Sequence, residues 1–243
     1  MWSIESACAV CLHLVSSSKL RRLRAVAGAS TVLRARYCTC GRYGSRISLV
    51  YRRSAFTRAT TEELRLSDTL IIQFAREPLP GQVKTRMLPE LNPEQACELH
   101  RELVLWTSHI LTASGVGEVQ LSVAGSTASP LFQQCRAMGI SSVRPRLGKG
   151  LGERMYRALE EGLQRYRKVI LVGSDCPQID QAYLQGAADM LDDCAVVLGP
   201  ALDGGYVLIG VRELDSQWFE GVAWGTETVY EETLANLQAR ATN

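Results

Sequence analysis

The sequence lacks several features that would place it at once in a large class of proteins. No apolar run approaches the roughly 20 residues that a membrane-spanning helix needs, so no membrane span is expected. No G-x-G-x-x-G follows the first apolar strand and no P-loop is present, so neither a dinucleotide site nor a Walker-type site is supported. The three histidines lie away from the motifs described below, which argues against a histidine as the catalytic base.

Acidic residues are almost absent from the first quarter of the chain. Residues 1–61 hold eleven lysines and arginines against one acid, Glu5, whereas residues 62–243 carry 16 basic and 24 acidic side chains. An acidic body argues against nucleic-acid binding. The basic, serine-rich residues 1–66 have no sustained helical or strand period, which is typical of a transit peptide, a disordered tail or a stretch translated from too early a start codon. We therefore expect 1–66 to be a disordered basic leader and 67–243 to form one folded domain.

The cysteines of the predicted domain are scattered singly rather than in close pairs. They are Cys97, Cys135, Cys176 and Cys194. Such a distribution indicates reduced, mostly buried thiols, which are typical of intracellular proteins. A cytoplasmic location is therefore predicted, although the composition of residues 1–66 leaves an organellar transit peptide open.

Apolar strands and amphipathic helices alternate along residues 67–243. The expected strands are 69–75, 118–124, 143–147, 168–173, 194–199 and 206–211, and the expected helices are 93–113, 130–138, 151–163, 182–191 and 226–239. In the first helix Ala96, Leu99, Leu103, Trp106 and Ile110 form the expected apolar side. The alternation predicts an α/β domain with a mostly parallel central sheet and helices on both faces.

One stretch, Val169–Pro177, combines a buried strand with a single carboxylate at its end. The apolar run VILV is followed by Gly173, Ser174 and Asp175. In open α/β sheets ligands bind beyond the carboxyl ends of the strands. Asp175 therefore lies where a metal, a ribose or a phosphate could be met. The alternative is that Asp175 only caps or tightens the turn before Pro177.

A cationic loop, residues 76–91, follows the first predicted strand. Its prolines exclude a helix, and Gly81 permits a backbone turn. Arg76, Lys84 and Arg86 bring three cations to this strand end. Several cationic donors on a glycine-containing loop suit a diphosphate, although a solvated basic loop is the alternative.

Three more motifs follow, each rich in glycine or acid. Gly152 and Arg154 open the helix at 151–163, where an anion is favoured. Asp203 precedes a Gly-Gly pair between the last two strands, where the backbone could approach a ligand, although a plain hairpin also favours Asp-Gly. Glu227, at the start of the last predicted helix, is either first-turn helix chemistry or a ligand.

Together these strings resemble the bacterial family of radical-SAM/selenodomain-associated transferase 1, placed among nucleotide-diphospho-sugar transferases of GT-A type. The matching strings are FAREPLPGQVKTRMLPEL, GLGERM, VILVGSDCPQI, LGPALDGGYVLIGV and WGTETV. They cover about residues 68–240 in the family's order. The resemblance implies a single GT-A-like (Rossmann-like) domain. It also implies a metal-dependent glycosyltransferase-like enzyme that uses a nucleotide-diphospho-sugar donor and a small-molecule acceptor.

The same resemblance implies roles for individual residues. The nucleotide and diphosphate would be held by Arg76, Gly81, Lys84, Arg86, Gly152 and Arg154, and the acceptor side would include Gly204, Gly205 and Tyr206. Asp175 would hold Mg2+ or Mn2+. Asp203 or Glu227 would activate or position the acceptor hydroxyl. Two positions depart from the family pattern, because Gly150 and Glu227 stand where the family usually has aspartate.

Two other functions stay open at this point. A nucleotidyltransferase would consume a nucleoside triphosphate and release pyrophosphate, and the string PGQVKTRM resembles the phosphate loop of such enzymes too. A non-catalytic nucleotide-binding domain could have lost activity through the changes at Gly150 and Glu227. The identity of the released phosphate group would separate the two enzymes.

Overall fold

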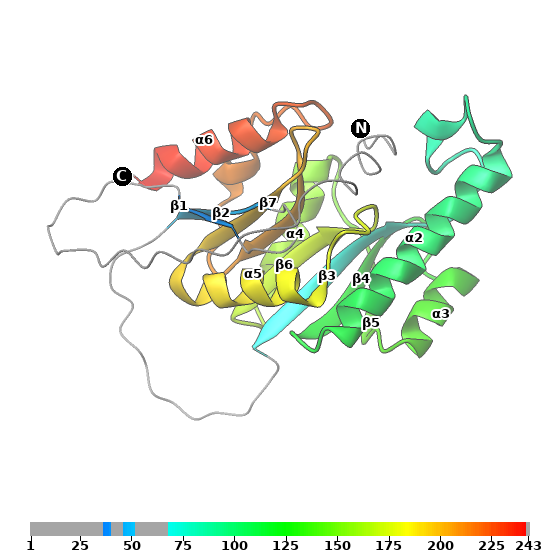
Figure 1. Ribbon diagram of the computed structural model, residues 1–243, viewed down its shortest axis with the longest axis horizontal. Coiled ribbons are helices and arrows are strands. Elements are labelled where there is room, and N and C mark those ends of the chain that lie inside the picture. The colour runs from blue at the N-terminus through cyan, green and yellow to red at the C-terminus, as the bar shows by residue number, and fades with distance from the viewer. Residues whose placement is uncertain (1–35, 40–45, 52–67, 242–243) are drawn as a thin grey trace, which may run out of the picture.

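The computed structural model describes residues 36–39, 46–51 and 68–241. They form one mixed sheet with helices on both faces (Figure 1). The strands are β1 (Arg36–Thr39), β2 (Arg46–Tyr51), β3 (Thr69–Arg76), β4 (Glu118–Ala124), β5 (Ser142–Pro145), β6 (Lys168–Gly173), β7 (Val196–Pro200) and β8 (Tyr206–Val211). The helices are α2 (Pro93–Ala113), α3 (Pro130–Ala137), α4 (Leu151–Leu163), α5 (Gln181–Asp193) and α6 (Val229–Ala241). Two short 3-10 helices, η1 (Thr85–Met87) and η2 (Ser216–Phe219), lie in connections.

The strand order is β1-β2-β7-β8-β6-β3-β4-β5. Strand β3 pairs in parallel with β4 on one side and β6 on the other, and β5 pairs in parallel with β4. Strand β8 runs antiparallel to both of its neighbours, β6 and β7. The predicted α/β class, with a central sheet flanked by helices, is therefore confirmed. The sheet is mixed, because the run β6-β3-β4-β5 is paired in parallel whereas the pairings along β1-β2-β7-β8-β6 are antiparallel.

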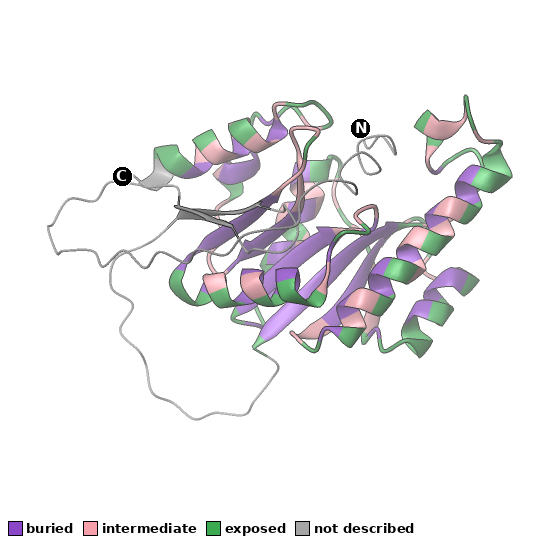
Figure 2. Ribbon diagram, in the orientation of Figure 1, coloured by how far each residue is buried: buried purple, intermediate pink, exposed green. Residues whose placement is uncertain are grey.

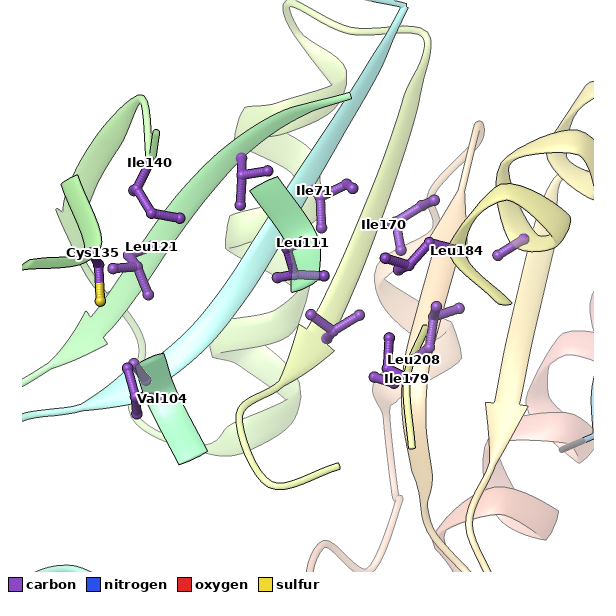
Figure 3. Close-up of a cluster of buried hydrophobic side chains, with 14 of the residues drawn as sticks. Ile71, Val104, Leu111, Leu121, Cys135, Ile140, Ile170, Ile179, Leu184 and Leu208 are labelled. Atoms are coloured by element: carbon purple, nitrogen blue, oxygen red, sulfur yellow. The ribbon is translucent and has the colours of Figure 1, made fainter. Parts of the chain in front are cut away.

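Two apolar layers hold the helices on the sheet. Helices α2, α3 and α5 bury side chains such as Leu111, Cys135 and Leu184 against one face (Figure 3). Helices α4 and α6 bury Leu159 and Leu237 against the other. Figure 2 shows the resulting pattern, with buried strands and helices whose outer sides are exposed. The apolar residues of β3 are buried on both faces, as expected for a parallel strand inside such a sheet.

Helix α2 has the predicted ends, but its buried side differs from the prediction. Asn92 accepts a hydrogen bond from the backbone N–H of Gln95 at 2.8 Å, and the Gln95 side chain accepts one from Asn92 N–H, which forms a capping box. The residues buried in α2 are Ala96, Cys97, His100, Val104, Thr107, Ser108 and Leu111. Trp106, expected inside, is 53% exposed. The helix is rotated about its axis relative to the prediction, because polar groups of the strands form hydrogen bonds with it.

Strands β1 and β2 lie within the segment that the sequence analysis left outside the domain. Strand β2 pairs antiparallel with β7, with Ser48 opposite Leu198 and Leu49 opposite Val197. It thereby covers backbone groups of β7 that an edge strand would expose. The arginines around it concealed a short strand-forming run, Ile47–Tyr51. The remainder of the predicted leader lies outside the described residues, so its disorder stays a prediction.

No helix in residues 68–241 combines the length and the apolar character that a membrane crossing requires.

Candidate functional site

A pocket of about 340 Å³ opens beyond the carboxyl ends of β3 and β6. The chain runs from β3 to its neighbour β4 on one side of β3, whereas β6 pairs with β3 on the other side. The chain connections therefore diverge between β3 and β6. Ligands of open α/β sheets bind at such a switch point. The polar and charged lining residues are Arg76, Lys84, His100, Arg146, Ser174, Asp175 and Tyr206.

An ion pair joins the two sides of this switch point. The Nζ atom of Lys84 lies 3.0 Å from Oδ1 of Asp175, and the two side chains are only 14% and 32% exposed. Lys84 is the one non-glycine residue with a positive φ in the described part of the chain, at 51°. A left-handed lysine costs on the order of 1–2 kcal/mol. The loop therefore holds a locally unfavourable backbone in the conformation that delivers the ammonium to Asp175.

A buried polar network positions the turn that carries Asp175. The amide nitrogen of Gln73 donates to Ser174 Oγ and to the carbonyl of Val104, both at 3.0 Å. Ser174 donates to the carbonyl of Phe74 at 2.7 Å. Ser108 of α2 donates to the amide oxygen of Gln73 at 2.8 Å. These bonds tie α2, β3 and the end of β6 together, and they explain why α2 buries polar residues.

Arg146, directly after β5, was not singled out from the sequence but lines the pocket. Its Nη2 donates to the carbonyl oxygens of Ala75 and Ser122, and its guanidinium lies 4.1 Å from the centre of the Phe74 ring. Burial, followed by the positive charges of Arg154 and Arg76, lowers the pKa of Arg146 to about 10. Arg146 is therefore a cation held by main-chain carbonyls at the pocket wall.

One histidine also lies at this pocket, which corrects the expectation that all three lie away from the motifs. The Nε2 atom of His100 lies 2.9 Å from the carbonyl oxygen of Arg76. Because a carbonyl only accepts, Nε2 carries the proton and Nδ1 is the unprotonated nitrogen of the neutral ring. Burial lowers the pKa of His100, which favours that neutral form near pH 7.

Four of the predicted site residues line the pocket: Arg76, Lys84, Asp175 and Tyr206. The others, Gly81, Arg86, Gly152, Arg154, Asp203, Gly204, Gly205 and Glu227, are not among its lining residues. Gly81 and Arg86 are exposed in the loop after β3. Arg154 is near enough for its charge to lower the pKa of Arg146. Burial raises the pKa of Tyr206, so its hydroxyl stays protonated.

The remaining predicted residues form a second group, next to Tyr206. The Tyr230 backbone N–H donates to the carbonyl of Gly204 at 2.8 Å, which joins the β7–β8 turn to the start of α6. Gly204 has a φ of +81°, and a Cβ there would lie 2.5 Å from the carbonyl carbon of Glu227. Oδ1 of Asp203 accepts a hydrogen bond from Gly205 N–H at 3.1 Å. The turns that carry Asp203 and Glu227 therefore touch, as main chain against main chain.

The GLGERM and WGTETV strings also meet. A Cβ on Gly152 would lie 2.7 Å from the indole nitrogen of Trp224, so the first turn of α4 packs closely against that ring. Trp224 also packs edge-on against Tyr206, with ring centres 6.4 Å apart. Gly150 stands where the family that the chain resembles usually has aspartate, and a Cβ there would meet nothing within 4 Å. Packing therefore does not require a glycine at this position.

A family model described as "Uncharacterized protein conserved in bacteria" (DUF2064) matches residues 107–226. A crystal structure from Desulfovibrio desulfuricans G20, provisionally described as a nucleotide-diphospho-sugar transferase, is 30% identical with a TM-score of 0.65. The match covers 73% of this chain and 78% of that one. The chain belongs to the GT-A-like superfamily of nucleotide-diphospho-sugar transferases.

Two other solved structures are much less similar to this chain. A cytidylyltransferase from Leptospira borgpetersenii is 13% identical, with a TM-score of 0.39 over 72% of this chain and 71% of its own. A nucleotidyl transferase from Methanothermobacter thermautotroptrophicus is 14% identical, with a TM-score of 0.42 over 71% and 83%. These likenesses are too weak to bear on function. No functionally curated protein matches the chain in sequence.

A divalent cation in this GT-A-like domain would have one carboxylate of the pocket as its protein ligand. Residues 68–241 contain no cluster of three His, Cys, Asp or Glu side chains suited to a metal. Asp175 is the acidic residue of the pocket lining, and its buried Oδ1 accepts no hydrogen bond of good geometry. Mg2+ at nucleotide sites is usually bound by one or two carboxylates together with substrate phosphates and waters. Asp175 fits a site of that kind, in which the substrate supplies the other ligands.

Proposed function

We propose that the protein is a glycosyltransferase-like enzyme that takes a nucleotide-diphospho-sugar as donor and a small molecule as acceptor. The observation that carries this proposal is the charge of the pocket. Arg76, Lys84 and Arg146 oppose a single carboxylate, Asp175, at the switch point of the sheet. A diphosphate needs several cationic donors, and the provisional description of the Desulfovibrio relative supports this substrate class.

The cations of the pocket would act on the leaving group. When the bond between sugar and diphosphate breaks, negative charge grows on the departing oxygen, and donors already held in place stabilise it. Lys84 is held in this way by its backbone conformation and by Asp175. Mg2+ or Mn2+, when bound by Asp175 and the phosphates, would neutralise part of the same charge.

The acceptor would be met on the side of Tyr206, where the Asp203 and Glu227 turns touch. A carboxylate there could take the proton of an acceptor hydroxyl or orient it. Asp203 is held by Gly205 N–H at one oxygen, which restrains its orientation. Replacing the family's aspartate by Glu227 keeps the charge and lengthens the side chain. The finer resemblance to radical-SAM/selenodomain-associated transferase 1 is part of this proposal.

The released phosphate group tests the proposal. The full chain is incubated with UDP-glucose or GDP-mannose, an acceptor mixture and Mn2+, and separately with nucleoside triphosphates and sugar phosphates. We expect nucleoside diphosphate from the sugar donors and no pyrophosphate from the triphosphates. Pyrophosphate release alone would replace the proposal with nucleotidyl transfer, and binding without any turnover would favour a non-catalytic nucleotide-binding domain.

A further inference from the structure

Arg146 is the cation of the pocket that belongs to none of the recognised motifs. It follows β5 directly, and its guanidinium reaches across β4 to β3. Its Nη2 donates to the carbonyls of Ala75 and Ser122, and the ring of Phe74 lies under it at 4.1 Å. Main chain and an aromatic ring thus hold one side of the group, whereas the pocket lies beside it.

The rest of the guanidinium has no partner in the described part of the chain. Its Nε is buried without a hydrogen-bond acceptor, and no described carboxylate lies within ion-pair distance. The charged groups that shift its pKa, Arg154 and Arg76, are also positive. Arg144, two residues earlier, contrasts with it because Arg144 pairs with Glu161 at 2.5 Å.

An enclosed cation without a counter-ion is unfavourable. Fixed backbone carbonyls offset part of this cost, but they carry only partial charges. The described part of the chain supplies no anion that balances this charge, and the pocket is the place from which a bound anion could reach Arg146. Guanidinium is well suited to phosphate because its planar donors match the phosphate oxygens.

We infer that Arg146 binds a phosphate group of the donor's diphosphate and lets this pocket hold a diphosphate without a divalent cation. This inference rests on the proposed function and deepens it. Arg76, Lys84 and Arg146 supply three positive charges, of which Asp175 offsets one. The remaining two charges are of the size that a bound diphosphate can balance. A metal held by Asp175 would then add to the binding of the diphosphate rather than be required for it.

The test is calorimetric titration of the full chain with inorganic pyrophosphate in EDTA. We expect measurable binding by the wild type and a dissociation constant about 10- to 100-fold higher for Arg146→Gln, the effect typical of losing a hydrogen bond to a charged group. Arg144→Gln is the matched control. It removes a neighbouring arginine that has its own carboxylate, and it should leave the dissociation constant unchanged.

A second variant separates binding from folding, since Arg146 also ties β3 to β4. Arg146→Lys keeps the charge but loses the planar donors. We expect it to fold and to bind pyrophosphate more weakly than the wild type but more tightly than Arg146→Gln. Thermal unfolding without ligand identifies any variant that is not folded. If Arg146→Gln is not folded, the pyrophosphate affinity of Arg146→Lys relative to the wild type tests the inference instead.

The outcomes distinguish this inference from the proposed function. If the wild type and both Arg146 variants bind pyrophosphate equally in EDTA, Arg146 does not bind phosphate, and the proposed phosphate binding by the pocket stands without it. If the wild type binds no pyrophosphate in EDTA but binds UDP, GDP, CDP or ADP with Mn2+, the metal-independent site is overturned and the proposed function stands. If it binds neither pyrophosphate nor any of these nucleotides, both are overturned.

Discussion

The contact between the two acidic turns makes a quantitative prediction about Gly204. Its φ is +81°, a conformation that costs alanine on the order of 1–2 kcal/mol. A Cβ there would also lie 2.5 Å from the carbonyl carbon of Glu227 and 2.6 Å from its Cα. Both neighbours are main-chain atoms, so no side-chain rotation relieves the overlap, and forced shifts of this kind cost about 1–3 kcal/mol. Gly204→Ala should therefore lower the free energy of unfolding by about 2–5 kcal/mol.

The neighbouring glycine provides the control. A Cβ on Gly205 would meet Oδ1 of Asp203 at 3.4 Å, which is ordinary contact, and its φ is not positive. Urea unfolding at pH 7.5 would compare both variants with the wild type. A loss of 3 kcal/mol would also lower the Tm by roughly 6–12 °C in a domain of this size. A change below about 0.5 kcal/mol for Gly204→Ala would refute the close packing of the Asp203 and Glu227 turns.

Three further predictions concern the pocket and the buried network that positions Asp175. Burial holds the pKa of His100 below its value in the unfolded chain, so the unfolded state binds the proton more readily. The free energy of unfolding should therefore fall as the pH drops through about 6.5. Urea unfolding at pH 7.5 and 5.5 should show a weaker pH dependence for His100→Gln than for the wild type. Gln73→Met removes the centre of the buried network and should cost about 1–3 kcal/mol of unfolding free energy, with a neutral result arguing that the network is dispensable. Asp175→Asn should abolish the Mn2+-dependent part of the thermal stabilisation by UDP-glucose, and unchanged stabilisation would remove Asp175 from the mechanism.

Local sequence signals were sufficient for most of the framework. The bounds of α2 and α4 and of β4, β6 and β8 match the prediction, because apolar periodicity and a strong cap such as Asn92 act over a few residues. The loop after β3 and the strand end before Asp175 were placed correctly at one edge of the sheet, since parallel strands bring their carboxyl ends together.

Long-range partners account for what the sequence concealed. The buried side of α2 is decided by Gln73, which lies 31 residues before Val104 and 101 before Ser174. Arg146 reaches the pocket because the carbonyls of Ala75 and Ser122 hold it. No local pattern marks either feature.

The orientation of side chains was equally hidden from the sequence. The motifs predicted a site containing Asp203 and Glu227, but neither residue is among those that line the pocket. His100, by contrast, reaches the pocket from a helix that carries no motif. A signal for His100 existed only in its spacing, since it lies three residues after the buried Cys97 and four before the buried Val104.

The central claim is that the pocket between the ends of β3 and β6 binds the phosphates of a nucleotide. Calorimetric titration of the full chain with UDP, GDP, CDP and ADP, each with Mn2+, tests it most directly. We expect one of them to bind with one molecule per chain, and Arg76→Gln to raise that dissociation constant at least about tenfold. Arg167→Gln, which alters an exposed arginine just before β6 at the opposite edge of the sheet, should have no effect. The claim would be contradicted if Arg76→Gln bound as tightly as the wild type, or if none of the four nucleotides bound.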